Sequence, residues 1–308
     1  MPSTEHPARR VALVSGASRG IGAAIALRLA ADGLDVAVNY RRGEEAAAEV
    51  VAAAQRAGAR AVAYAADVSS YDEDAAMVER VVGDFGRLDV LICNAGIASR
   101  GATVADTDPA EPARVLGVHA VGAHHLAALA LPHLRRHARS DVVMVSSTAA
   151  ARPAAGGAPY MMAKVALEAL ARTLALEEAG NGVRVNIVAP GLTVTAMGDR
   201  LARAVTGAAG AADLDTATPF GRVTRPEDVA AVVAFLVSAD AAMVTGQRVE
   251  VTSGTPMPTR PLEDGGPQSA TDRRCRSRKR RGACFGRPDD QRALNRSAPS
   301  IRMTSPLR

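Results

Sequence analysis

The chain has 308 residues, 48% of them hydrophobic, so it is long enough and apolar enough to bury a core. It shows no basic leader followed by an apolar run and no stretch of about 18 apolar residues, so we expect a cytoplasmic protein without a membrane span. The formal net charge is +5, but residues 259–308 hold 13 Lys and Arg against 5 Asp and Glu, which leaves the rest of the chain mildly acidic.

Over residues 11–258, short apolar runs alternate with longer helical patterns, which is typical of a parallel sheet with helices on both faces. The predicted strands are, in chain order, RVALVS, DVAVNY, RAVAYA, LDVLIC, DVVMVS, VRVNIV and QRVEVT. Helices are expected to begin near Ile21, Glu44, Glu73, Pro112, Pro159 and Pro226. A long excursion at 192–225 is expected to be a loop over a site. We predict one doubly wound, Rossmann-type α/β domain with a seven-stranded parallel sheet.

This domain is predicted to span residues 1–258. Residues 259–308 have few aliphatic side chains and no periodic apolar face, so they are predicted to be a basic, disordered tail. Such a tail could bind polyanions, but it lacks aromatic side chains interleaved for base stacking, and nucleic acid is an unlikely partner.

The first predicted strand is followed by the glycine-rich stretch SGASRGIG and then by a helical pattern. Gly16 and Gly20 permit a tight turn, and Gly22 lets the helix pack closely on the strand, so the helix N-terminus faces an anion such as a pyrophosphate. The spacing G-x-x-x-G-x-G departs from the usual dinucleotide fingerprint, and taken alone it leaves an ordinary tight turn open.

Five motifs together resemble the short-chain dehydrogenase/reductase family, from about residue 9 to residue 255. They are SGASRGIG, ADVS, CNAG, YMMAK and NIVAPG, in that order. Within the family, the sequence looks most like the 3-oxoacyl-acyl-carrier-protein reductases and the related polyketide ketoreductases. The resemblance implies an oxidoreductase that passes a hydride from a nicotinamide cofactor to a ketone or acyl-thioester substrate, and it implies a homo-oligomer, either a dimer or a tetramer.

The cofactor contacts implied by the resemblance lie in and beside these motifs. They are Gly16, Ser18, Arg19, Gly20, Ile21, Gly22, Tyr40, Arg41, Asp67, Val68, Asn94, Ala95, Gly96, Tyr160, Lys164, Pro190, Gly191, Thr193 and Thr195. The second strand ends in NYRR, without an acidic residue for the ribose 2′-hydroxyl of NAD, and the guanidinium groups of Arg19 and Arg41 suit a 2′-phosphate. We therefore predict NADP(H).

Tyr160 and Lys164 are four residues apart on a predicted helix, so their side chains share one face. A tyrosine phenol has a pKa of about 10, and a nearby ammonium group together with the positive nicotinamide of the oxidised cofactor is expected to lower it. In the family, the tyrosine protonates the carbonyl oxygen of the substrate, and a serine matched by Ser147 hydrogen-bonds to that oxygen. Ser146 is the weaker candidate for this serine.

Two positions depart from the family pattern, because Cys93 and His119 stand where the family has asparagine. The asparagine matched by His119 holds a water that links the lysine to solvent. A neutral imidazole can hold the same water, whereas an imidazolium has only donors. We expect an active enzyme whose ketone reduction slows as His119 is protonated at about pH 6–7. The alternative is a helix histidine that points away from the site.

These departures also leave open a non-catalytic, NADP-binding regulatory protein on the same fold. Cys93 is interpreted as a small strand-end residue and not as a nucleophile, since no partnering base is evident. His133 and His137 have the spacing of metal ligands, but the two arginines between them favour a solvated helix end, and we predict no metal site.

Overall fold

The computed structural model describes residues 9–254, so the predicted tail and its boundary at residue 258 lie outside the described residues. Seven parallel strands form one sheet in the order β3-β2-β1-β4-β5-β6-β7. They are β1 (Val11–Val14), β2 (Asp35–Tyr40), β3 (Ala61–Ala65), β4 (Val90–Cys93), β5 (Ser140–Val145), β6 (Val183–Pro190) and β7 (Arg248–Val251). The predicted doubly wound, seven-stranded parallel sheet is confirmed.

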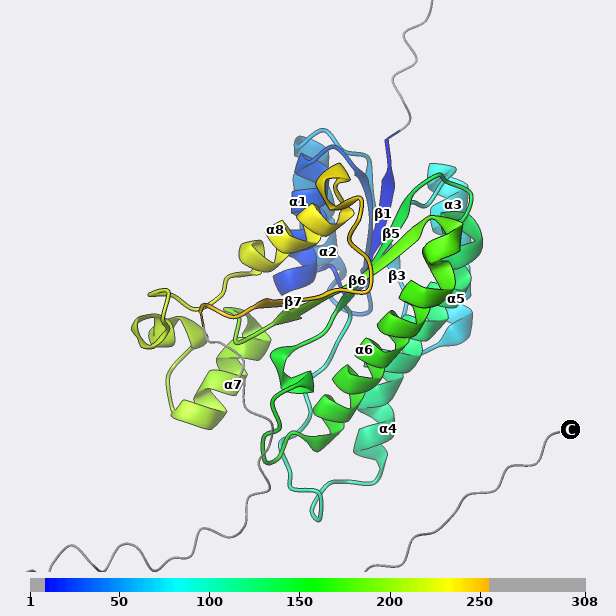
Figure 1. Cartoon of the computed structure of the whole chain (residues 1–308). Helices are drawn as coiled ribbons and strands as arrows, with labels where there is room; N and C mark the ends of the chain where they lie inside the picture. Colours follow the sequence, from blue (N-terminus) through cyan, green and yellow to red (C-terminus); the bar gives the residue numbers. More distant parts are fainter. Residues whose placement is uncertain (1–8, 255–308) are drawn as a thin grey trace, which may run out of the picture. The chain divides into compact units, whose positions relative to one another are not determined.

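Helices cover both faces of this sheet, as Figure 1 shows. They are α1 (Gly20–Ala31), α2 (Glu44–Arg56), α3 (Tyr71–Phe85), α4 (Ala110–Leu116), α5 (Gly122–Leu134), α6 (Ala158–Glu178), α7 (Ala196–Thr206) and α8 (Pro226–Val237). Alternate strand residues point to opposite faces. Val14 therefore packs in the core under α1, α2 and α8, while Leu13 packs in the core under α3, α5 and α6.

The helix predicted near Pro112 contains a π-helical turn. Residues Gly117–Val121 form this turn between α4 and α5. The continuous helix Ala110–Leu134 is long and apolar enough to cross a membrane by length and composition, although it contains no uninterrupted run of about 18 apolar residues. More than half of the most apolar 18-residue stretch of this helix is buried inside the fold, and the core helix of a globular protein can be equally long and apolar.

The excursion at 192–225 was expected to be a loop, and this expectation is wrong. It contains α7 and a 3-10 helix at Ala211–Ala217. Thr195 caps the N-terminus of α7 by accepting a hydrogen bond from the backbone N–H of Gly198. Ala202, Ala211 and Val223 form a small core of their own.

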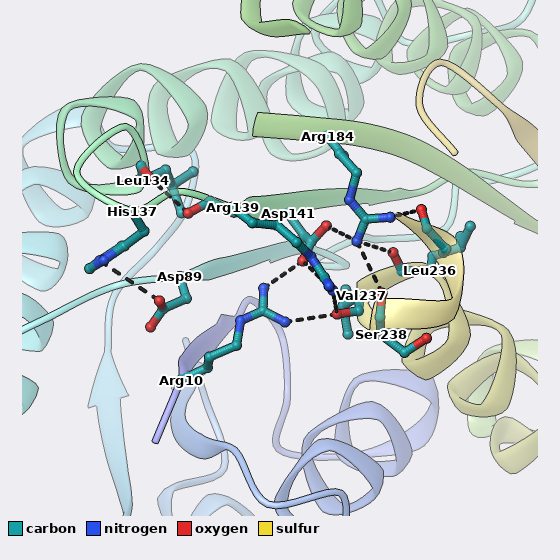
Figure 2. Close-up of polar contacts among 12 residues, drawn as sticks. Arg10, Asp89, Leu134, His137, Arg139, Asp141, Arg184, Leu236, Val237 and Ser238 are labelled. Carbon is teal, nitrogen blue, oxygen red and sulfur yellow. Dashed lines mark hydrogen bonds and ion pairs between the residues drawn. The ribbon is translucent and has the colours of Figure 1, made fainter. Parts of the chain in front are cut away.

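At the amino ends of the central strands, arginines surround a buried carboxylate (Figure 2). Asp141 pairs with Arg10 at 2.5 Å, with Arg139 at 3.6 Å and with Arg184. Arg10 and Arg139 also donate to the carbonyl of Val237, at the end of α8, at 2.7 and 2.5 Å. The guanidinium groups therefore neutralise the carboxylate and satisfy the last carbonyl groups of a helix, where positive charge is favourable.

Candidate active site

Ser147, Tyr160 and Lys164 come together at the carboxyl end of β5. Ser147 follows the strand, and the other two side chains share one face of α6, whose start at Pro159 suits a residue without an N–H. The Tyr160 hydroxyl lies close enough to Ser147 for that side chain to act on its pKa. The Nζ of Lys164 lies 5.7 Å from the centroid of the Tyr160 ring and donates to the carbonyl of Val145 at 2.7 Å.

Burial controls the titration of this centre. Lys164 is 3% exposed, and burial lowers its pKa to about 7, against an opposing effect of the Glu168 carboxylate. Burial raises the pKa of Tyr160, while its hydrogen bond with Ser147 acts in the opposite direction. In the chain alone, burial therefore outweighs this hydrogen bond, and the lowering expected from Lys164 and the bound nicotinamide stays a prediction.

His119 lies on the π-helical turn and faces the same centre. Its ring is edge-on to the Tyr160 ring, with 5.3 Å between centroids. Its Nε2 lies 2.8 Å from the carbonyl oxygen of Ile97 and 3.0 Å from the nitrogen of that residue. Gly96 makes room for the imidazole, because a Cβ there would lie 2.5 Å from its Cε1. The alternative that His119 points away from the site is wrong.

The same surroundings keep the imidazole neutral. Burial, followed by the charge of Lys164, lowers the pKa of His119 to about 3. The expectation that His119 is protonated at about pH 6–7 is therefore wrong, because the sequence could not show how deeply the ring is buried. Its Nδ1 is buried without a hydrogen-bond partner within residues 9–254, whichever tautomer binds Ile97.

The glycine loop between β1 and α1 has the backbone geometry that a pyrophosphate requires. Gly16 and Gly20 have φ angles of +62° and +57°, which favour glycine. A Cβ on Gly22 would lie 2.4 Å from the carbonyl oxygen of Gly16. Arg19 at the N-cap of α1 provides no side-chain cap, and the first turn has no acidic residue. The first N–H groups of α1 are thus suited to an anionic ligand.

Two polar residues that the sequence analysis did not select hold this loop. Asn39 of β2 accepts from the backbone N–H of Gly16 at 3.0 Å. Ser15 accepts through its Oγ from the backbone N–H groups of Asn94 and Ala95. Asn94, predicted as a cofactor contact, donates to the carbonyl oxygens of Ser15 and Gly16 at 2.9 and 3.1 Å. A buried asparagine in the apolar strand DVAVNY was the available signal for Asn39.

The part of the predicted cofactor site that would hold the 2′-phosphate is exposed and basic. Arg19 ends the glycine loop and Arg41 follows β2, and β1 and β2 are neighbouring strands, so both arginines come from one edge of the sheet. Arg41 pairs with Asp67 at 3.0 Å. Asp67 also accepts from the backbone and hydroxyl of Ser69, and the pKa of its carboxyl group is lowered by these contacts and by Arg41 against the effect of burial.

The segment after β6 holds three of the predicted cofactor contacts, Gly191, Thr193 and Thr195. Gly191 donates from its backbone to the carbonyl of Val251 at 2.9 Å, and Thr193 donates to the carbonyl of Gly191 at 3.1 Å. A Cβ on Gly20 would lie 3.5 Å from the Cγ2 of Thr195. The segment after β6 therefore lies against the glycine loop, and the fold brings the two ends of the predicted cofactor site together.

Cys93 is buried, and burial together with the charge of Asp74 raises the pKa of its thiol, so it stays protonated. His137 lies 3.8 Å from Asp89 at the opposite edge of the sheet. In the part of the chain that the structure describes, no group of three or more His, Cys, Asp and Glu side chains could hold a metal ion.

Comparison with known proteins places the chain in a family. Residues 16–255 match the family model described as Enoyl-(Acyl carrier protein) reductase. The chain is 37% identical to 3-oxoacyl-(acyl-carrier-protein) reductase of Staphylococcus aureus over 79% of this chain and 96% of that protein. It is 38% identical to cis-4-hydroxycyclohexanecarboxylate dehydrogenase of Sinomonas cyclohexanicum over 80% of this chain and 96% of that protein.

Among solved structures, NAD+-bound xylitol dehydrogenase matches with a TM-score of 0.75 and 30% identity, over 81% of this chain and all of that one. The family model covers the glycine loop from Gly16 onward and the Ser147, Tyr160 and Lys164 centre. The chain belongs to the short-chain dehydrogenase/reductase family of oxidoreductases.

Proposed function

We propose that the protein is an NADPH-dependent reductase of ketones, with 3-oxoacyl thioesters and related keto compounds as the substrate class. The arrangement of Ser147, Tyr160 and Lys164 beside the glycine loop carries this proposal. The similarity to a 3-oxoacyl-(acyl-carrier-protein) reductase and to a dehydrogenase of a cyclic hydroxy acid supports a carbonyl or alcohol substrate. When bound, the dinucleotide would supply the hydride from its nicotinamide ring.

Tyr160 is the proton donor in this proposal. Its raised pKa keeps the phenol protonated at neutral pH, as a general acid requires. The Ser147 side chain lies near the phenol, so a carbonyl oxygen placed between the two hydroxyl groups would accept from both. Lys164 supplies positive charge beside the phenol, and its protonated form favours loss of the phenolic proton to the substrate.

His119 supports this centre without touching the substrate. Its unpartnered Nδ1 is available to hold a water close to the phenol and to Lys164, a role that the family gives to asparagine. The neutral imidazole would serve in either tautomer, because Nδ1 is a donor in one and an acceptor in the other.

Arg19 and Arg41 would select NADPH. Without cofactor, Arg41 pairs with Asp67, and a 2′-phosphate would offer it a stronger, bidentate partner. We expect NADPH to bind at least about tenfold more tightly than NADH, since a charge-assisted phosphate contact contributes about 1.5–3 kcal/mol. Fluorescence titration of Arg41→Asp should show this preference erased or reversed, while Arg56→Asp, the same charge change at the exposed end of α2, keeps it. Equal affinity of the unaltered protein for both cofactors would exclude the assignment.

Turnover tests the main proposal. NADPH oxidation is followed by absorbance with a panel of 3-oxoacyl thioesters and simple ketones. Consumption of NADPH with at least one of them supports a reductase, and cofactor binding without turnover across the panel would favour the non-catalytic regulatory protein. The oligomeric state and the cytoplasmic location stay predictions.

A further inference from the structure

A buried carboxylate lies directly behind the candidate active site. Glu168 is 4% exposed and stands one helical turn after Lys164 on α6. It accepts from the Ser146 hydroxyl at 2.7 Å, from the Arg248 Nε at 2.8 Å and from Arg172 at 2.8 Å. A buried charge that has this many donors is fully compensated, so Glu168 is a fixed point in the structure.

This fixed point belongs to a set of contacts that hold the end of β5. Three consecutive residues are each tied to another element. The carbonyl of Val145 accepts from Lys164 at 2.7 Å, and the Ser146 hydroxyl donates to Glu168. The carbonyl of Ser147 accepts from Arg248 at 3.2 Å. The backbone that presents the Ser147 hydroxyl is therefore held by α6 and by β7.

Arg248 is itself held in place from the far side. Its Nη1 donates to Glu250 at 2.5 Å, two residues further along β7. Glu250 also accepts from Arg152 at 3.2 Å, just after the 3-10 turn that follows Ser147. One guanidinium group thus joins two carboxylates and one carbonyl oxygen, which uses its rigid fork of donors in a way that lysine could not.

The same carboxylate also acts on Lys164 electrostatically. The groups that face Lys164 are Glu168 and Tyr160 on its own helix and His119 on the π-helical turn. Glu168 is the one of these that favours the charged ammonium, against burial. Its own charge is faced by Arg172 from α6 and by Arg248 from β7.

We propose that Glu168 and Arg248 are positioning residues of the active site, of which Glu168 favours the charged form of Lys164 and Arg248 fixes the backbone of Ser147. The proposal rests on the proposed reductase function for its catalytic consequence. Its structural consequence, the charge state of Lys164, is measurable without any turnover. The two residues act by different routes, so their variants should have different signatures.

The chain makes the charge measurement direct, because Lys164 and Lys279 are its only lysines. Selective ¹³C labelling of lysine gives two side-chain signals, and a Lys164→Arg variant assigns them. In Glu168→Gln, we expect the titration midpoint of Lys164 to fall by about one pH unit, because a nearby opposite charge is lost. In Arg248→Met, the midpoint should stay or rise, since a cation facing Glu168 is removed.

Turnover by the same variants separates the routes further. Glu168→Gln should shift the fall of kcat/KM on the alkaline side to lower pH. Arg248→Met should lower kcat at least about tenfold at every pH with a small change in KM, because a misplaced Ser147 affects the transition state more than binding. The substitution Arg248→Lys restores charge without the fork, so it should not restore kcat.

Matched controls lie at the other end of α6. Glu178 is also a buried glutamate of α6 and accepts from Arg135 at 2.9 and 2.5 Å. Glu178→Gln and Arg135→Met should lower the melting temperature like the test variants but leave the Lys164 midpoint and kcat unchanged.

An unchanged Lys164 midpoint in Glu168→Gln, or full kcat in folded Arg248→Met, would overturn the corresponding half of the proposal. Absence of turnover in the unaltered protein would instead reject the reductase function and leave the result of the lysine titration intact.

Discussion

Both ends of the central strands carry buried charged groups, but the partners of these groups differ between the two ends. At the amino ends, Asp141 is surrounded by arginines that also satisfy the end of α8. At the carboxyl ends, Lys164 is buried with a carbonyl oxygen as its hydrogen-bond partner, and His119 keeps an unpartnered nitrogen. The buried charges at one end are paired with each other and stabilise the fold, whereas the unpartnered nitrogen of His119 at the other end is available for a ligand.

The largest expected effect concerns the carboxyl ends. Tyr160→Phe removes the proposed proton donor and should lower kcat about 1000-fold, within the range of general acid catalysis. The fold should persist, because the variant loses one hydroxyl group and keeps the aromatic ring. Tyr64→Phe, on β3, is the matched control, since the Tyr64 hydroxyl donates to Asp84 of α3 at 2.7 Å. NADPH consumption measures both, and a Tyr160→Phe variant with more than a tenth of the original kcat would contradict the assignment.

The amino ends should respond in stability and not in catalysis. Asp141→Asn leaves three guanidinium groups sharing a neutral amide, and removal of one partner of a buried ion pair destabilises proteins by about 3–5 kcal/mol. Urea unfolding should show a loss near the lower end of this range, because Arg10 and Arg139 are partly exposed. Asp228→Asn, which breaks an exposed pair with Arg222, should lose at most about 1 kcal/mol. Equal losses in the two variants would remove the contrast between buried and exposed pairs.

Much of the fold could be predicted from the sequence. Short apolar runs predicted the strands, because strands such as β1 and β4 are buried on both faces of the sheet. The helix α7 was missed although its signals were present, with Thr195 as an N-cap and Gly207 just past the end. The π-helical turn that aims His119 has no such signal, since it depends on packing between helices.

The contacts around the site are harder to predict than its motifs. Arg248 and Glu168 are 80 residues apart, so no local pattern joins them. The direction of the pKa shifts of His119 and Tyr160 depends on burial, which is a property of the folded chain. Residue identity gives the chemistry that is possible, whereas tertiary packing decides which protonation state is populated.

The next effect in size is expected on the stability of the protein, from a buried carboxyl group without a hydrogen-bond partner. Asp74 on α3 is fully buried, and neither oxygen has a hydrogen-bond partner in the described part of the chain. Burial, with the charges of Asp67 and Glu73, raises its pKa to about 8. The folded protein therefore keeps a proton that the unfolded chain releases at about pH 4, so stability falls as the pH rises from about 4 to about 8 and levels off above that.

Asp74→Asn should remove this pH dependence, so it should stabilise the protein by a few kcal/mol more at pH 8 than at pH 5. Urea unfolding of both proteins at the two pH values measures it. Asp72→Asn, in the exposed first turn of the same helix, should show no such gain. A loss of stability at pH 8 would mean that Asp74 is ionised and paired in solution.

The smallest expected effect is that of His119→Asn. Because the pKa of His119 is lowered to about 3, the imidazole stays neutral between pH 5 and pH 8 and can hold a water through Nδ1 in either tautomer. Asparagine offers the same pair of functions, a donor and an acceptor, so kcat should change by less than about threefold and the acid limb of the pH profile should be the same in both proteins. His119→Phe, which fills the space against Gly96 without a polar atom, should lower kcat more. If the acid limb flattened in His119→Asn alone, the imidazole would titrate near neutral pH. The availability of its Nδ1 for a ligand would then depend on the protonation state of His119 and not on packing.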